Sequence, residues 1–166
     1  MDSIVQAWIA EIPGLDGASL ELALYAIRLD SILHNALDSA IGEFGLTRSD
    51  FDVLTALHAS GRERDIRHSE LKAHLVLSSG GATNILNRLE QRGLIERVHN
   101  MDDGRSKHVR LTPLGEDLTV QAIHAYVRVH NVLFRNMTTA QTHNAARALR
   151  QVMSALHDDS SPRNLL

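Results

Sequence analysis

The chain has 166 residues, a length of about one domain, and a formal net charge of −3; hydrophobic residues make up 43% of it and aromatic residues only 4%. A composition rich in Leu, Ile, Val and Ala favours a helical protein over a sheet sandwich, and the absence of cysteine excludes disulfides and thiolate zinc sites. No apolar run approaches the roughly 20 residues needed to cross a bilayer, and the N-terminal segment carries acids where a secretory signal needs bases, so we expect a cytoplasmic protein without a membrane partner.

Two helices are predicted in residues 1–46. Residues 3–12 carry apolar side chains at helical spacing, and a Pro-Gly pair followed by Gly17 interrupts that pattern. A long helix with regularly spaced apolar residues then covers residues 19–44 and ends at Gly45. We expect these helices to contribute to dimerisation and to one wall of a ligand pocket.

The next segment predicts the first part of a helix-turn-helix. Thr47 and Asp50 resemble a capping box, with Asp in place of the usual Glu, for a helix that ends near Ala59. Ile66 is expected to form a short strand, and a helix over residues 68–75 follows it. A turn then leads into a second, more polar helix.

This polar helix begins at Ser78 and ends at Gly93, and its apolar residues fall on one face, opposite the polar ones. Its two adjacent glycines each cost roughly 1 kcal/mol relative to alanine, which close approach to a nucleic-acid backbone would offset. A helix N-terminus attracts phosphate, and Arg88 can reach a phosphate or a guanine. The candidate DNA contacts are Ser78, Ser79, Gly80, Gly81, Thr83, Asn84, Asn87 and Arg88. The alternative is a surface helix, weakened by glycine, whose serines only cap it.

Two short strands with alternating apolar residues follow and predict a β-hairpin, or wing. Asp103 and Gly104 supply the turn, which places Arg105 at the tip, where Asp103 can brace it through a salt bridge. A guanidinium there can enter a minor groove and read its shape and negative potential. The candidate DNA contacts of the wing are Asp103, Arg105 and Ser106. A solvated hairpin turn is the alternative, and His99 and His108 are expected to face each other across the hairpin.

Charge is distributed unevenly along the chain. Residues 1–61 contain two Lys or Arg and nine Asp or Glu, whereas residues 62–110 contain ten and seven, a local charge of +3. Local positive charge attracts phosphate even where the whole chain is acidic, although an ordinary solvated face would also carry it. The sequence therefore predicts a mainly α fold with a small β-hairpin wing, in which residues 47–112 form a winged helix-turn-helix DNA-binding domain.

Residues 113–166 predict two helices for dimerisation. Thr112 and Pro113 begin a helix that runs to about Asn136, and Thr138 caps the last helix. Both helices carry apolar stripes that need a partner, and a second copy of the chain would supply one. A two-fold dimer would place two DNA-binding domains roughly 34–36 Å apart, which is one turn of DNA.

The stretches SSGGATNILNRLEQRG and GLIER…DDGRSKHVRLTPLG resemble the recognition helix and the wing of the MarR family of bacterial transcriptional regulators. The similarity covers about residues 20–155. It implies a homodimer with a winged helix-turn-helix that represses an operator in double-stranded DNA until a small, often phenolic or aromatic, ligand releases it. The family's wing arginine falls on Arg105 and its bracing acid on Asp103.

A narrower resemblance concerns family members that respond to urate or related ring anions. Those members carry an extra N-terminal helix with a tryptophan, an aspartate early in a core helix and an arginine on the first wing strand, which Trp8, Asp52 and Arg97 match. They also have an arginine in the recognition helix where this chain has Ile85. Because its neighbours in the chain are apolar, the Asp52 carboxylate needs a charged or hydrogen-bonding partner. Arg97 could be that partner, and an anionic ligand could compete with Asp52 for it. Arg28 is a further candidate ligand contact, and the alternative is a structural Asp–Arg pair with Trp8 as a hydrophobic plug.

Two other classes of function are alternatives on the same residues. A small helical enzyme would need a catalytic motif, but the chain has no nucleophile elbow, phosphate loop or dinucleotide fingerprint. The ten histidines show no metal-ligand spacing such as HExxH, so we expect neither a metal nor a cofactor. A winged-helix protein-interaction module without specific DNA binding is the stronger alternative.

Overall fold

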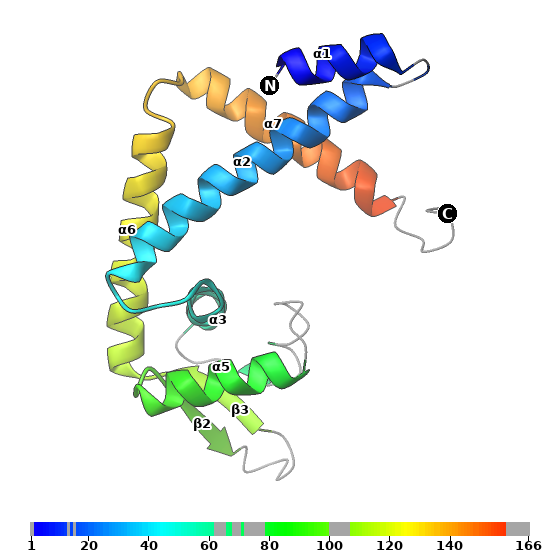
Figure 1. Ribbon diagram of the computed structural model, residues 1–166. Helices are drawn as coiled ribbons and strands as arrows, with labels where there is room; N and C mark the ends of the chain where they lie inside the picture. Colours follow the sequence, from blue (N-terminus) through cyan, green and yellow to red (C-terminus); the bar gives the residue numbers. More distant parts are fainter. Residues whose placement is uncertain are drawn as a thin grey trace. The chain divides into compact units, whose positions relative to one another are not determined.

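The computed structural model describes residues 2–12, 14, 16–61, 66–67, 71, 79–99 and 107–158, which fall into two compact units, Met1–Val129 and His130–Leu166. The elements of the first unit are α1 (Asp2–Glu11), α2 (Gly17–Gly42), α3 (Arg48–Ala59), β1 (Ile66–Arg67), α5 (Ser79–Gln91), β2 (Ile95–His99), β3 (Lys107–Leu111) and α6 (Pro113–Leu133) (Figure 1). Helix α6 runs into the second unit, where α7 (Thr139–Asp158) follows. This arrangement confirms a mainly α fold with a small β-hairpin.

The first two helices are joined by a short turn. The Asp16 carboxylate accepts a hydrogen bond from the backbone N–H two residues on, at 3.1 Å, and therefore caps α2. Gly17, which the sequence suggested as a helix breaker, is instead the first residue of α2. After α2 ends, Gly45 adopts a φ of +61°, and the Leu46 N–H bonds to the Ile41 carbonyl at 3.3 Å. The chain thereby turns sharply into α3.

The capping box predicted at the start of α3 is present. The Thr47 N–H donates to Asp50 Oδ2 at 2.9 Å, and the Asp50 N–H donates to Thr47 Oγ1 at 3.3 Å. These two bonds satisfy backbone groups that the helix itself leaves unpaired. The helix ends at Ala59, as predicted.

Among the described residues, one apolar core packs the helices against the sheet. Its members come from α2, α3, α5, α6, the strands and the residue at position 71: Leu37, Ile41, Leu46, Phe51, Val53, Leu54, Leu57, Leu71, Ile85, Leu86, Leu89, Leu94, Ile95, Val109 and Ala122. The helix predicted over residues 68–75 lies outside the described residues except at Leu71. The core therefore joins both ends of the DNA-binding segment to the long helices.

The sheet is antiparallel, with the strand order β1-β3-β2. The short strand predicted at Ile66 is present and pairs with Val109. In the hairpin, Val98 pairs with His108, whereas His99 pairs with Lys107. The expectation that His99 and His108 face each other is therefore wrong, because the register places them one step apart and side chains alternate between the two faces of a strand.

Helix α6 begins at Pro113, as predicted, and Thr112 caps it by accepting the Gly115 N–H at 3.0 Å. It ends at Leu133 rather than near Asn136. The side of α6 that faces the core carries small residues, namely Gly115, Thr119, Ala122 and Ala125. Small side chains allow the helix axis to approach the rest of the first unit closely.

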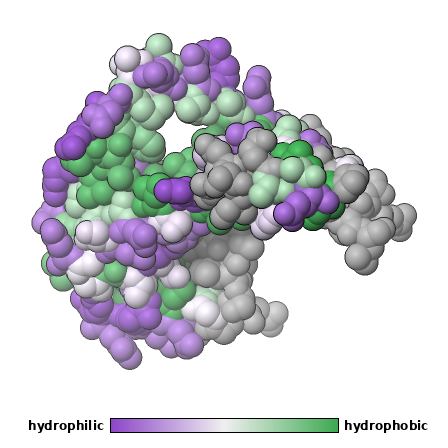
Figure 2. Space-filling model, turned by 45° about the horizontal axis from the view of Figure 1, so that its top comes forward, coloured by the Kyte–Doolittle hydropathy of each residue, from purple (hydrophilic) through white to green (hydrophobic). Residues whose placement is uncertain are grey.

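In the second unit, Thr138 and Gln141 form a reciprocal cap at the start of α7, which confirms the predicted cap. Large hydrophobic side chains remain exposed in both units, as Figure 2 shows in green on one face of the single chain. They include Leu22, Tyr25 and Ile27 of α2, Val127, Val132 and Leu133 of α6, and Leu149, Met153 and Leu156 of α7. Within the described residues, no helix is apolar enough over sufficient length to cross a membrane.

Candidate nucleic-acid interface

Helix α5 divides into an apolar side and a polar side, as expected for a recognition helix. Its core-facing residues are Ala82, Ile85, Leu86 and Leu89, all buried. Thr83 and Asn84 are exposed, whereas Gly81 and Asn87 are half-buried. Ser78 lies outside the described residues, and so do the side-chain positions of Ser79 and Gly80. The exposed polar surface of the helix is therefore centred on Thr83 and Asn84.

Arg88 turns back from α5 onto the start of α3. Its Nη2 donates to Asp50 Oδ1 at 2.6 Å and to Thr47 Oγ1 at 3.1 Å, and its Nε donates to Asp50 Oδ1 at 3.1 Å. Asp50 is only 1% exposed, and its other oxygen is already used in the capping box. Arg88 thus supplies the positive charge that a buried carboxylate requires.

Arg92, the first residue after α5, contacts the turn that follows α2. Its Nη1 donates to the Gly45 carbonyl at 2.7 Å and its Nη2 donates to the Phe44 carbonyl at 2.9 Å. Both carbonyls belong to the turn between α2 and α3, where a backbone acceptor needs a donor from outside the helix. A guanidinium suits two consecutive carbonyls, because it presents several donors in one plane.

A third arginine fixes α5 from the side of the sheet. Arg97 on β2 donates to Asn87 Oδ1 and also lies 3.2 Å from Glu90 Oε2, measured from its Nη1. Asn87, expected to contact DNA, is therefore partly engaged by the wing strand.

The wing begins at a well-defined root. The Thr112 hydroxyl donates to the Gly93 carbonyl at 2.6 Å, and the Thr112 N–H donates to the Leu94 carbonyl at 3.1 Å. These bonds connect both ends of the hairpin where it leaves α5 and enters α6. The tip residues expected to contact DNA, Asp103, Arg105 and Ser106, lie outside the described residues.

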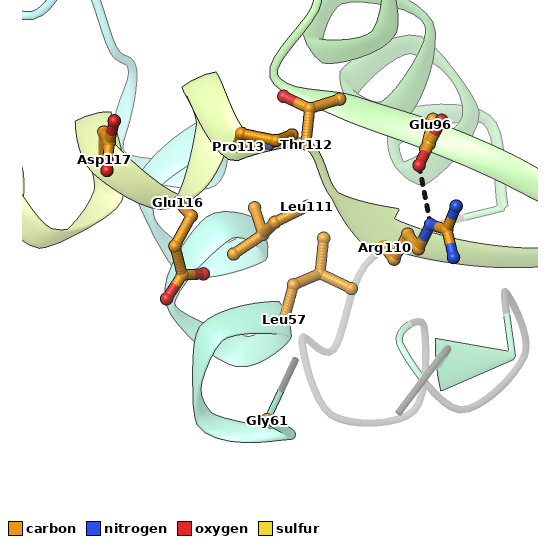
Figure 3. Close-up of a pocket in the computed structure, with 9 residues that line it drawn as sticks. All are labelled: Leu57, Gly61, Glu96, Arg110, Leu111, Thr112, Pro113, Glu116 and Asp117. Carbon is orange, nitrogen blue, oxygen red and sulfur yellow. Dashed lines mark hydrogen bonds and ion pairs between the residues drawn. The ribbon is translucent and has the colours of Figure 1, made fainter. Parts of the chain in front are cut away.

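A pocket of about 450 Å³ opens beside this root (Figure 3). Its lining combines the apolar residues Leu57, Leu111 and Pro113 with the acids Glu96, Glu116 and Asp117, together with Gly61, Arg110 and Thr112. Arg110 Nε donates to Glu96 Oε1 at 2.6 Å, and His58 Nδ1 lies 3.0 Å from Glu116 Oε1. With three carboxylates and one arginine, this pocket does not suit an anionic ligand.

The comparisons with known proteins agree with this geometry. A family model of the MarR family matches residues 44–106, which span the α2–α3 turn, the recognition helix and the first wing strand. The HTH-type transcriptional regulator PecS of Dickeya dadantii is 29% identical over 127 residues, which is 76% of each chain. The multiple antibiotic resistance protein MarR of Salmonella typhimurium is 29% identical over 118 residues, 70% of this chain and 80% of that protein.

A mutant MarR from E. coli has the same fold, with a TM-score of 0.69 and 25% identity over 80% of this chain and 96% of that one. The chain is therefore similar to the MarR family over residues 44–106 and shares the fold of a solved MarR. The matched relatives are transcriptional regulators, and this similarity supports a DNA-binding regulator rather than an enzyme.

The four residues expected to bind a ligand are spread over three helices and a strand. Trp8 on α1 is 44% exposed, and Arg28 on α2 and Asp52 on α3 are also exposed. The expected pair of Asp52 with Arg97 is not formed, because Arg97 contacts Asn87 and Glu90 instead. Desolvation raises the pKa of the Asp52 carboxyl, an effect that the charge of Arg48 partly opposes.

The sequence did not indicate Arg92, nor the second role of Asp50 as a partner of Arg88. One signal was available: Arg88 and Arg92 are four residues apart and therefore share a face of the predicted helix. Their contact partners could not be predicted from the sequence, because the contacted residues lie 38 to 48 positions earlier in the chain.

Proposed function

We propose that this chain is a homodimeric repressor of the MarR family that binds a palindromic operator and releases it when a small aromatic or anionic molecule binds. Residues 47–112 contact DNA in this proposal, and residues 1–46 and 113–166 supply the dimer interface and the wall of a ligand pocket. The DNA contacts are those expected from the sequence on α5 and at the wing tip, and the ligand contacts are Trp8, Arg28, Asp52 and Arg97.

The observation that carries the proposal is the construction of α5. One side of this helix is buried in the core, and its opposite side exposes Thr83 and Asn84. Hydroxyl and amide groups are suited to base edges and phosphates alike. A mutant MarR from E. coli with the same fold, at a TM-score of 0.70 and 24% identity, has been solved in a complex with operator DNA.

Dimer formation is supported by the exposed hydrophobic side chains of α2, α6 and α7. Exposed apolar surface of this kind is typical of interaction surfaces rather than of monomers. A two-fold pair is the simplest closed arrangement that would cover the same surface on both copies.

The test is fluorescence anisotropy with the duplex that lies upstream of the protein's own gene, run over a salt series and against a scrambled duplex. We expect specific binding in the range of about 10⁻⁸ to 10⁻¹¹ M. Arg105→Ala should lose that binding while the dimer and the melting temperature survive. Arg147→Ala, which removes the same charge from an exposed position on α7, is the matched control.

A panel of urate, other purines and aromatic carboxylates is then added to the bound complex. Loss of binding with one class identifies the effector, and a coupling of about 1–3 kcal/mol corresponds to a 5- to 150-fold loss of affinity. Weak binding that does not distinguish the two duplexes at any salt concentration would refute the proposal and favour a protein-interaction module.

A further inference from the structure

Arg88 of α5 and Arg92, the first residue after α5, connect the recognition helix to the corner between α2 and α3, the segment from Phe44 to Asp50. Arg92 contacts two carbonyl groups of the turn that follows α2, and Arg88 contacts the capping box at the start of α3. The corner therefore has an arginine on each of its two sides. The two arginines are four residues apart, and the Arg92 N–H bonds to the Arg88 carbonyl, so they lie on one side of the end of the recognition helix.

The contacts on the two sides are chemically different. At the start of α3, a buried carboxylate divides its oxygens: Asp50 Oδ1 accepts from Arg88, while Oδ2 accepts from Thr47. In the turn that follows α2, Arg92 uses separate nitrogens for two consecutive carbonyl groups. The geometry of each contact depends on a planar guanidinium, which a lysine ammonium cannot reproduce.

These contacts restrict what the two side chains can do at a DNA surface. Nε and Nη2 of Arg88, and both terminal nitrogens of Arg92, already donate to protein acceptors. An arginine engaged in this way fixes its own helix rather than reading the groove in front of it. The polar residues that face outward, Thr83 and Asn84, then depend on the corner for their position.

We propose that Arg88 and Arg92 are positioning residues, which hold the recognition helix on the α2–α3 corner so that α5 follows any movement of the end of α2. This inference rests on the proposed function for its effect on operator binding, and it changes the expected role of Arg88 from a DNA contact to a support. Movement of α2, the helix assigned to the dimer interface and ligand pocket, would reach α5 through these two side chains.

The test compares the full-length wild type with Arg92→Ala, Arg92→Lys, Arg88→Lys and Asp50→Asn, and uses Arg147→Ala as the control for loss of one charge. Asp50 is 1% exposed and also belongs to the capping box, so its substitution affects binding through the positions of α3 and α5 and not through a DNA contact. Melting temperatures identify any variant that does not fold, and Arg92→Lys is the mildest of the set.

The first readout is amide hydrogen exchange of residues 79–91 in the free protein, with residues 119–129 of α6 as the internal reference. We expect α5 to exchange at least about tenfold faster in Arg92→Ala and Arg92→Lys, with α6 unchanged. Unchanged exchange in α5 would overturn the inference, whatever the protein does with DNA.

The second readout is operator affinity against a scrambled duplex over a salt series. We expect Arg92→Lys, Arg88→Lys and Asp50→Asn each to lose at least about tenfold in operator affinity, with the scrambled-duplex affinity and the salt slope unchanged. Arg88→Lys combined with Asp50→Asn should lose no more than either alone, because both break one contact. Full operator affinity in the lysine variants, with a salt slope reduced by about one in Arg92→Ala, would indicate a direct phosphate contact and overturn the inference.

The two readouts separate the inference from the proposed function. A wild type that does not distinguish the operator from the scrambled duplex refutes the proposed function, and the exchange measurement still decides whether the arginines hold α5.

Discussion

A Cβ atom added at Gly115 would lie 1.8 Å from the carbonyl oxygen of Leu94 and 2.8 Å from its carbonyl carbon. The first turn of α6 therefore rests directly on the backbone that joins α5 to the wing. The Leu94 carbonyl also accepts the Thr112 N–H, so it lies between the cap and the first turn of the same helix. This approach requires glycine, because backbone cannot move aside as the end of a flexible side chain can.

Gly115→Ala is expected to destabilise the protein by about 1–3 kcal/mol or more, because the new methyl group must displace α6 from the root of the wing. Urea denaturation measures the change. Gly42→Ala is the matched control, since a Cβ at this helical position meets nothing within 4 Å. The control is expected to be neutral or slightly stabilising, and equal loss in both variants would contradict the close contact at Gly115.

Thr47→Ala is expected to cost about 1 kcal/mol, because it removes the side-chain oxygen that caps α3. The same oxygen accepts from Arg88, so the variant also weakens the attachment of α5. Thr47→Ser keeps the hydroxyl and should recover most of the stability in chemical denaturation. If serine were as destabilising as alanine, the lost methyl group and not the cap would be responsible.

Asp52→Asn is expected to increase stability relative to the wild type as the pH rises. Desolvation raises the pKa of Asp52 above its ordinary value of 3.8, despite the opposing charge of Arg48, so the folded state favours the protonated carboxyl. The stability that this group contributes is present below 3.8 and is lost as the pH rises through its folded-state pKa. Melting temperatures of the wild type and the variant from about pH 4 to pH 7 test this. A difference in melting temperature that stays constant over this range would show that the pKa of Asp52 is not raised by folding.

Glu96→Gln is expected to change the free energy of unfolding by less than about 1 kcal/mol. The pair of Glu96 with Arg110 is short, at 2.6 Å, but 48% of each side chain is exposed. Water and salt screen such a pair, in contrast to the contact between Arg88 and the buried Asp50. A loss above about 2 kcal/mol in thermal unfolding would show that this cross-strand pair is more than a surface contact.

The sequence predicted those parts of the fold that depend on neighbouring residues. The Thr47–Asp50 box, the Thr138 cap and the strand at Ile66 were confirmed because caps and short strands are determined by local residue types. The start of α2 was missed by two residues, since a glycine is acceptable at the first helical position once Asp16 caps it. The recognition helix and wing could be identified because their motifs are specific.

Partners across long sequence separations could not be predicted from the sequence. Arg97 was assigned to Asp52, yet it contacts Asn87 and Glu90, which the hairpin brings closer. The contact of Arg92 with the Phe44 carbonyl has no signal in the sequence, because any backbone carbonyl is a possible acceptor. The pairing of His108 with Val98 depends on the length of the connection between the strands, and residue type alone does not specify it.

The extent of the core limits how the chain can be shortened. Leu37 and Ile41 of α2 and Ala122 of α6 belong to the same apolar cluster as the recognition helix, and the rings of Phe51 and Tyr126 of α6 form a tilted pair with centroids 5.5 Å apart. A fragment cut at residues 47 and 112 would expose this cluster on two sides and should not fold. The smallest autonomous fragment that keeps the cluster begins before Leu37 and ends after Tyr126. The DNA-binding domain therefore cannot be separated by truncation unless the fragment also includes parts of α2 and α6.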